Sequence, residues 1–518
     1  MAKPLILWVD DEIEYLKPHI MFLDARGYEV ITASNGHDAL DICKERPEIE
    51  LVILDESMPG MTGLEVMESL NKFRPNLKTI MVTKNESDDV MKSAFGKDTQ
   101  AYLLKPVVSQ QVYASVAGLL NKKAFVQQDT NIGYTKEHQQ ILSEIYEDPN
   151  HEQWVEIYKK FISWELKMFQ NDNQVFMDNL INQKATANQA FSKYIAQNYE
   201  AWLKDDSGPL LSHHLLKKKV FPHLVNQDRP TVFLLMDNLR LDHWMAIEPI
   251  ISEVFREEES DSFYSILPTT TQFSRNAIFS GLLPADIEKK YKDKWRNDTE
   301  EGGKNDFEAF FLEEQLKRHI RQPIKMEYFK VTNAEAANSL EQKMVNMVQK
   351  DFVVIVYNFI DMLSHAGTEM DFVKQLANND QSYRELVKNW FVNSPLWKSL
   401  KRIAEKDIQL IISTDHGTIK VKTPSSIKAE KDTTNNLRYK SGKNLSFEPK
   451  DVFSIKNPSS VGLPSLNLSS SYVFALEDKF FLYPNNFNRI KQLYSDTYQH
   501  GGVSMEEMIC PFARFVPK

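Results

Sequence analysis

The chain has 518 residues, 42% of them hydrophobic and 26% charged, and carries a formal net charge of −10 at pH 7. This length exceeds what one ordinary hydrophobic core holds, so we expect about two to four domains. The acidic balance excludes bulk nucleic-acid binding, and no apolar run is long enough to span a bilayer. The two cysteines, Cys43 and Cys510, form no CxxC pair, and with the acidic N-terminus they indicate a cytoplasmic protein.

Four short apolar runs in the first 122 residues each end at polar residues. The residues that follow them are Asp10 and Asp11, Asp55, Thr83 and Lys105. Segments with helical spacing lie between the runs. This alternation predicts a parallel sheet whose strand ends share one edge, where the carboxylates meet. Carboxylates so close together repel one another unless a divalent cation lies among them, and an all-oxygen set suits Mg²⁺. Thr83 and Lys105 could then hold a phosphoryl group carried by Asp55.

The stretches "VDDE", "LVILDESMPGMTGLEVM", "IMVT" and "YLLKP" resemble a two-component receiver domain in order and spacing. The resemblance covers residues 1–122 and implies that Asp55 accepts a phosphoryl group from a sensor histidine kinase. It also implies that Asp10 and Asp11 hold Mg²⁺ with the backbone of Ser57, and that Tyr102 is the aromatic switch. The alternative is an ordinary doubly wound domain with acidic residues at its strand ends.

Residues 123–206 change to long helical patterns with recurring aromatic residues. The aromatic stripes predict the core of a helical bundle, although a partner-binding face is the alternative. We find no helix-turn-helix with a basic recognition helix, so no direct DNA-binding domain is expected. The segment therefore predicts a helical connector.

Strand-helix alternation resumes in residues 207–518. Asp and His residues follow the apolar runs of "PTVFLLMDNLRLD", "DFVVIVYNFID" and "IQLIISTDHG" or lie in "NFIDMLSHAG" and "YQHGGVSMEEM". These residues are Asp237, Asp361, His365, Asp415, His416 and His500. Carboxylate and neutral imidazole are ligands of Zn²⁺ and, less often, Mn²⁺ or Fe²⁺. Six such groups fit about two ions, the arrangement that serves phosphoryl transfer.

A nucleophile candidate lies in "ILPTTTQFSRNAIFSGLLP", where three threonines, Thr269 to Thr271, precede a predicted helix. A threonine at a helix N-terminus faces free backbone N–H groups that favour a phosphate, and a nearby metal ion would activate its hydroxyl. A simple N-cap is the alternative function of these residues.

With these pieces in order, residues 230–518 resemble the alkaline phosphatase superfamily, in its PglZ-type branch. The resemblance implies one metal ion on Asp361, His365 and His500. It implies a second on Asp237, Asp415 and His416, with Thr271 as nucleophile and bridging ligand. A threonine nucleophile is similar to that of nucleotide pyrophosphatases and phosphodiesterases, whose asparagine three residues further on is Ser274 here.

More than fifty residues with little periodicity lie between His416 and a predicted strand near Tyr472. They predict a long loop, either functional or disordered. Within it "LRYKSGKN" gathers Arg438, Lys440 and Lys443, which could bind a substrate phosphate or simply be solvated.

The order of the three parts resembles PorX-type response regulators, which are associated with type IX secretion. We expect an α/β protein with a flavodoxin-like receiver (1–122), a helical-bundle connector (123–206) and an alkaline-phosphatase-like α/β domain (207–518). The predicted function is a zinc-dependent phosphodiesterase of nucleotide-type substrates, controlled through Asp55 and through homodimer formation on phosphorylation. Secretion-system components are expected partners. A non-catalytic signalling scaffold and a phosphomonoesterase or mutase are the rival hypotheses.

Overall fold

The computed structural model describes residues 3–83, 101–120, 134, 136–170, 174–204, 208–225, 229–297, 300–430, 433–465, 469–485 and 487–518. The chain divides into two compact units, residues 1–136 and 137–518. The predicted domain boundaries at 122 and 206 both lie outside the described residues. No helix in the described part is both long and apolar enough to cross a membrane.

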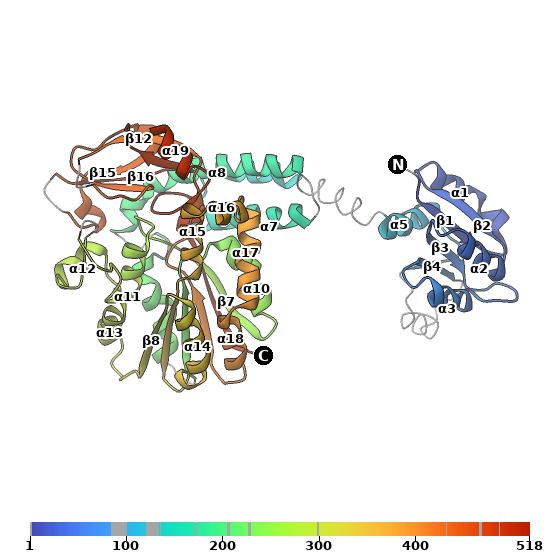
Figure 1. Ribbon diagram of the computed structural model, residues 1–518, viewed down its shortest axis with the longest axis horizontal. Coiled ribbons are helices and arrows are strands. Elements are labelled where there is room, and N and C mark those ends of the chain that lie inside the picture. The colour runs from blue at the N-terminus through green and yellow to red at the C-terminus, as the bar shows by residue number, and fades with distance from the viewer. Residues whose placement is uncertain are drawn as a thin grey trace. The chain divides into compact units, whose positions relative to one another are not determined.

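The first unit is a five-stranded parallel sheet in the order β2-β1-β3-β4-β5, with helices on both faces (Figure 1). This order is the flavodoxin-like one, which confirms the predicted fold. Its strands are β1 (Leu5–Val9), β2 (Glu29–Ala33), β3 (Ile49–Asp55), β4 (Lys78–Thr83) and β5 (Ala101–Leu104). Its helices are α1 (Lys17–Asp24), α2 (Gly36–Glu45), α3 (Gly63–Phe73) and α5 (Ser109–Leu120).

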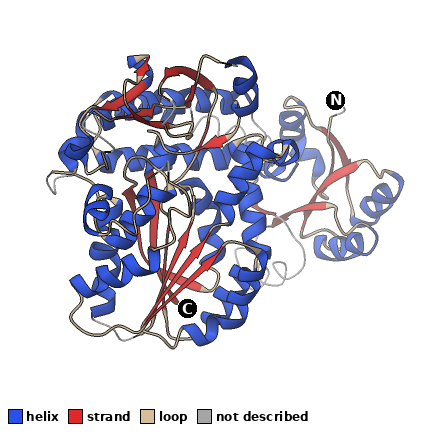
Figure 2. Cartoon of the chain, turned by 60° about the vertical axis from the view of Figure 1, so that its left-hand side comes forward, coloured by secondary structure: helices blue, strands red, loops and turns tan. Residues whose placement is uncertain are grey.

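The second unit is built on a six-stranded sheet in the order β7-β19-β10-β6-β9-β8. β10, β6, β9 and β8 are parallel, and β19 is antiparallel to both of its neighbours. Figure 2 shows these strands between layers of helices. The strands are β6 (Thr231–Met236), β7 (Phe255–Tyr264), β8 (Met326–Val331), β9 (Phe352–Tyr357), β10 (Gln409–Ser413) and β19 (Ile509–Pro517).

The helices of this second sheet join its strands and cover both of its faces, as a parallel sheet requires. Every residue of β6, β9 and β10 is buried, because helices cover these strands on both sides. Apart from a few polar residues at their ends, the strands are apolar. The second unit contains the helices α9 (Phe221–Val225), α10 (Leu241–Ile251), α11 (Asn276–Ser280), α12 (Pro284–Lys290), α13 (Glu308–His319), α14 (Ala334–Met347), α15 (Phe359–Glu369), α16 (Asp371–Leu376), α17 (Asp380–Asn393), α18 (Pro395–Ile403) and α20 (Met505–Met508), and α19 (Phe487–Tyr494), which packs on a smaller sheet.

The predicted long loop after His416 is wrong, because short strands organise much of it. Together with three strands that begin at Ser471 or later, they form three small sheets in the orders β11-β18, β14-β12-β17 and β13-β16-β15. Strands this short pair with segments far along the chain and leave no period in the sequence. They are β11 (Ile419–Lys420), β12 (Thr423–Lys428), β13 (Tyr439–Gly442), β14 (Ser446–Phe447), β15 (Val452–Ile455), β16 (Ser471–Ala475), β17 (Lys479–Leu482) and β18 (Tyr498–Gln499).

The helical segment contributes α7 (His151–Gln170) and α8 (Gln174–Trp202), which lie side by side (Figure 1). Most of its predicted aromatic core is buried, but part of it packs on the six-stranded sheet and not within the helix pair. The Phe191 ring lies 5.4 Å from Trp154 of α7 and 6.2 Å from Tyr264 of β7, between ring centroids. The helices and the sheet therefore share one core.

This shared core predicts that a cavity in α8 destabilises the whole second unit. Phe191→Ala should lower its free energy of unfolding by about 3–5 kcal/mol, because the removed ring is fully buried. Chemical denaturation should show this loss in the transition of the second unit and none in that of the receiver. Phe372→Ala is the matched control and should change stability by less than about 0.5 kcal/mol, since Phe372 is 70% exposed. Equal effects of the two variants would contradict the shared core.

Candidate functional site

The carboxyl ends of three parallel strands deliver acidic side chains to one edge of the second sheet. Asp237 directly follows β6, and Asp361 lies in the first turn of α15, which follows β9. Asp415 and His416 follow β10. Because β6 pairs with both β9 and β10, the three strand ends are neighbours. This is the edge where ligands bind in open α/β sheets.

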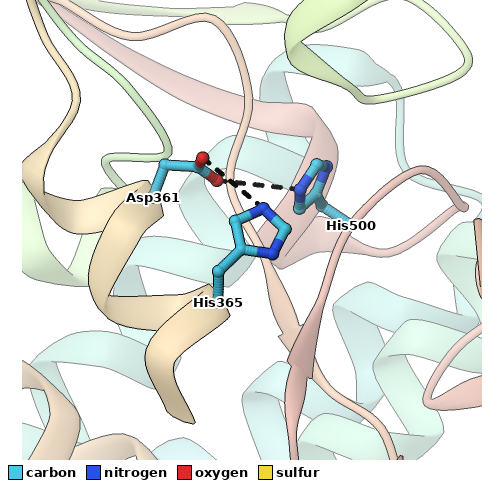
Figure 3. A group of neighbouring side chains, drawn as sticks. All are labelled: Asp361, His365 and His500. Atoms are coloured by element: carbon cyan, nitrogen blue, oxygen red, sulfur yellow. Dashed lines mark ion pairs between the residues drawn. The ribbon is translucent and has the colours of Figure 1, made fainter. Parts of the chain in front are cut away.

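One group of potential metal ligands consists of Asp361, His365 and His500, with donor atoms within 4.8 Å of one another (Figure 3). His365 Nε2 lies 3.5 Å from Asp361 Oδ2, since the two residues stand one turn apart on α15. His500 Nε2 lies 3.7 Å from Asp361 Oδ1. The His365 side chain is 60% exposed, so this group opens to solvent.

A second group, Asp237, Asp415 and His416, is fully buried, and its donor atoms also lie within 4.8 Å of one another. The rings of His416 and His500 stack with centroids 4.3 Å apart, so the two groups are adjacent. Asn238 joins them, because its backbone N–H donates to Asp415 and its side chain to Asp361. The structure thus brings together all six predicted metal ligands.

Backbone carbonyls orient two of the three imidazoles of this site, those of His416 and His500. His416 Nδ1 lies 3.0 Å from the carbonyl oxygen of Gly417, and His500 Nδ1 lies 3.2 Å from that of Thr269. A carbonyl only accepts, so each Nδ1 must carry the proton and each Nε2 must present a lone pair. Both lone pairs face the carboxylates, as metal-binding histidines require.

The electrostatics of the site fit a bound cation. Burial raises the pKa of Asp237 to about 6 and that of Asp361 to about 6, and it lowers the pKa of His416 and of His500. Asp415 Oδ2 is buried and accepts no hydrogen bond from the described residues. The Arg275 Nε atom lies 3.7 Å from this oxygen, too far for a hydrogen bond, so a bound cation would still stabilise it. Buried carboxylate with neutral imidazole is a donor set that suits zinc.

Thr271 is the threonine that the structure places among these groups. Its hydroxyl lies 3.1 Å from His416 Nε2 and 3.5 Å from Asp237 Oδ1. The hydroxyl of Thr269 instead donates to the Gly502 carbonyl, and that of Thr270 is buried with no hydrogen bond in the described part. The predicted helix after the threonines is a π-helical turn (Thr271–Arg275) that continues into α11.

Arg275 is a site residue that the sequence reasoning missed. Its guanidinium is buried and lies 2.9 Å from Asp237, 2.7 Å from Glu308 and 3.7 Å from Asp415. It therefore offsets part of the negative charge of the second group. Its place four residues after Thr271, one helical turn away, was the available signal.

Ser274 bonds to Ser265 and to a backbone carbonyl, so its hydroxyl is already used.

The predicted basic phosphate-binding patch is not formed as expected. The Arg438 guanidinium is buried and binds Glu507 through two hydrogen bonds of 3.1 and 2.6 Å. Lys440 is also buried and donates to a backbone carbonyl, and burial lowers its pKa to about 8. Lys443 is partly exposed. Arg438 is a structural residue here, because Glu507 attracts it inward.

The first unit gathers its predicted residues at the same kind of edge. Asp10, Asp11 and Asp55 place donor atoms within 4.8 Å of one another. Lys105 Nζ lies 2.8 Å from Asp10 and 3.0 Å from Asp55, and burial raises the pKa of Asp55 against the opposing effect of this ammonium. An all-carboxylate set with an exposed mouth fits Mg²⁺.

The remaining predicted receiver residues lie near this cluster or outside the described part. The Thr83 hydroxyl donates to the carboxylate of Glu56, a residue that the sequence reasoning did not include. Ser57 is exposed and follows Glu56. The backbone of Tyr102 lies in β5, but its side chain is outside the described residues.

The first unit is similar to many known receiver proteins, of which two relatives and one solved structure are examples. Chemotaxis protein CheY of Treponema pallidum is 30% identical over 117 residues, which are 22% of this chain and 81% of that protein. The alkaline phosphatase synthesis transcriptional regulatory protein PhoP of Bacillus subtilis is 34% identical over 120 residues, 23% of this chain and 48% of that protein. A receiver domain structure from Clostridium thermocellum is 30% identical and covers 24% of this chain and 98% of that chain, with a TM-score of 0.22.

Three family profiles match the chain in succession. A response regulator receiver domain matches residues 6–117, and a PorX response regulator linker domain matches residues 124–203. A BREX system PglZ alkaline phosphatase-like domain matches residues 215–515, more than half of the chain. Receiver and alkaline phosphatase-like domains generally bind divalent cations. The chain belongs to the PglZ alkaline phosphatase-like family and carries a response regulator receiver domain at its N-terminus.

Proposed function

We propose that this chain is a two-component response regulator in which phosphorylation of Asp55 controls a zinc-dependent phosphodiesterase of nucleotide-type substrates. The observation that carries the proposal is the position of the Thr271 hydroxyl, 3.1 Å from His416 Nε2 and 3.5 Å from Asp237 Oδ1. A scaffold kept only for binding partners has no need of a hydroxyl held beside six oriented metal donors. The observed set therefore supports catalysis over the scaffold hypothesis.

The residues of this chain supply the nucleophile and its orientation. Asp361, His365 and His500 would hold one zinc ion and Asp237, Asp415 and His416 the other, with Mn²⁺ as the alternative metal. Bound there, the two cations would lower the pKa of the Thr271 hydroxyl and offset charge on the phosphate. The Thr271 oxygen would attack phosphorus and expel one alcohol of the diester. Water would then displace Thr271 and release the monoester product.

The charges around the site favour diesters over monoesters. A monoester carries one more negative charge than a diester and needs a further cation. The Arg275 guanidinium is shared among Asp237, Asp415 and Glu308, and that of Arg438 is bound by Glu507. Neither is placed to neutralise a terminal phosphate. This supports a singly charged phosphodiester as substrate.

In the receiver, the partner would be a sensor histidine kinase, which the receiver family implies. Lys105 already bridges Asp10 and Asp55, and a phosphoryl group on Asp55 would give it and Thr83 a new set of oxygens to bind. This rearrangement would change the receiver surface and favour a homodimer. The linker match to PorX response regulators supports type IX secretion as the regulated process, with secretion-system components as partners.

The first test of the proposal is metal content. Full-length protein is exposed to zinc and then desalted to remove weakly bound ions. Elemental analysis should then find about two zinc ions per chain. His500→Ala should lose about one of them. His319→Ala is the matched control, because His319 packs beside Phe221 and lies in neither donor group. A wild-type protein that stays zinc-free would contradict the proposal.

The nucleophile is tested by Thr271→Val, which keeps the shape of the side chain and removes its hydroxyl. Turnover of a nitrophenyl or dinucleotide diester should fall by about a thousandfold while zinc content is unchanged. Thr270→Val is the matched control and should retain activity, since its hydroxyl makes no hydrogen bond in the described part. Loss of activity in the control alone, or a preference for monoesters, would overturn the assignment.

The role of Asp55 is tested by adding beryllofluoride and Mg²⁺, which mimic the phosphorylated aspartate. Sedimentation should show that the association constant of the dimer rises by at least about tenfold. The diesterase rate should change as well. Asp55→Ala should show neither effect. An unchanged sedimentation profile with unchanged activity in the wild-type protein would remove this role from the receiver.

A further inference from the structure

One face of α8 points into the phosphatase-like fold over most of the length of the helix. Five buried residues lie on it at spacings of four, four, three and four, which places them in one stripe. They are Lys184, Asn188, Ser192, Ile195 and Tyr199. Three of these side chains make hydrogen bonds to segments that lead directly to the candidate active site.

The Asn188 amide holds the turn that follows His500 in the chain. Its Nδ2 donates to the Glu506 carboxylate at 2.9 Å, and its Oδ1 accepts from the Met505 backbone N–H at 2.9 Å. One turn further along α8, the Ser192 hydroxyl donates to the Val503 carbonyl at 3.4 Å. All of these groups are buried, and Asn188 and Glu506 lie at the wall of a cavity. Loss of the Asn188 amide would leave the Met505 N–H without its partner, which costs free energy at a buried position.

The same turn contacts glycines that lie close in the chain to both histidines of the stacked pair. The Gly502 N–H, two residues after His500, donates to Glu507 at 2.9 Å. The Gly417 N–H, next to His416, donates to the Glu507 carbonyl at 3.0 Å. The approach is so close that a Cβ at Gly417 would lie 2.0 Å from the Glu506 carbonyl oxygen. A shift of this turn would therefore move His416 and His500.

Tyr199 holds the other side of the site. Its hydroxyl accepts from the Leu267 backbone N–H at 2.8 Å, and Leu267 stands four residues before Thr271. Between them, Thr269 binds the His500 segment through its hydroxyl and its carbonyl. Tyr199 is buried, and its ring lies against Phe453 of β15 with centroids 6.3 Å apart. The hydroxyl is thus fixed in place by packing.

We propose that Asn188 and Tyr199 are positioning residues of the active site, through which α8 sets the placement of the His500 turn relative to the Thr271 segment. The two residues are eleven positions apart on one rigid helix, about 16 Å along its axis. The distance between the His500 turn and the Thr271 segment then depends on the linker helix α8 as well as on the sheet. The activity readout rests on the proposed function, but the conformational readout does not.

Hydrogen exchange of the metal-free, full-length protein tests the proposal directly. Asn188→Ala should speed exchange of backbone amides in residues 501–508 by at least about tenfold and leave residues 265–272 unchanged. Tyr199→Phe, which removes one oxygen atom, should show the reverse pattern. The two variants separate the two contacts, and Tyr199→Phe adds no cavity that would threaten folding.

The controls are matched to each substitution. Asn198→Ala removes an amide of the same helix that donates to the Tyr194 carbonyl, within α8. Tyr158→Phe removes a buried linker hydroxyl that has no hydrogen-bond partner in the described part of the chain. Both should exchange like the wild-type protein in residues 265–272 and 501–508. Local protection that is the same in Asn188→Ala, Tyr199→Phe and the controls would overturn the inference.

Zinc affinity and kinetics supply the second readout. Competition with a chromophoric chelator should show zinc bound at least about fivefold more weakly in Asn188→Ala, whose altered turn carries His500. Tyr199→Phe should lower kcat by about tenfold with KM within about twofold, because it moves the nucleophile and not a substrate contact. Faster exchange spread evenly over the whole second unit would show a role in stability alone and would also overturn the proposal. A wild-type protein without diesterase activity would refute the proposed phosphodiesterase function. The hydrogen-exchange rates and the zinc affinity would still decide whether Asn188 and Tyr199 position the site.

Discussion

The confinement of three carboxylates at one edge of a buried parallel sheet is the constraint on which the second unit depends. Asp237, Asp361 and Asp415 follow neighbouring strands and cannot move apart without breaking the sheet. Their mutual repulsion is strong because Asp237 and Asp415 are buried, and it has to be offset. Arg275 supplies one positive charge, and the neutral imidazoles leave room for metal cations to supply the rest. Bound cations would therefore offset the repulsion among the carboxylates that this fold brings together.

The receiver uses the same topology on a smaller scale. Asp10 and Asp55 also end adjacent parallel strands, and Lys105 lies between their carboxylates as Arg275 does in the second unit. The difference is exposure. The receiver cluster includes the exposed Asp11, whereas Asp237, Asp415 and His416 are buried and His365 is the exposed member of the six donors.

The linker helices are held to the second unit by more than chain continuity. Their aromatic residues share a core with the phosphatase-like sheet, and α8 binds the segments on either side of the active site. A rigid helix that contacts both segments couples their positions, since a displacement of the helix changes both sets of bonds. Any signal that reaches α8 along the chain would therefore act on the geometry of the site.

The sequence by itself determined the fold class, the two large sheets and all six metal-ligand candidates, because strand ends and short motifs are local patterns. It also singled out Thr271 among three threonines, through resemblance. Only the tertiary structure decided that Arg438 is buried against Glu507 and that the segment after His416 forms sheets. Only it revealed that Asn188 bonds to a residue 317 positions away. Partners so distant leave no period or spacing in the chain, so their pairing appears when the fold brings them together.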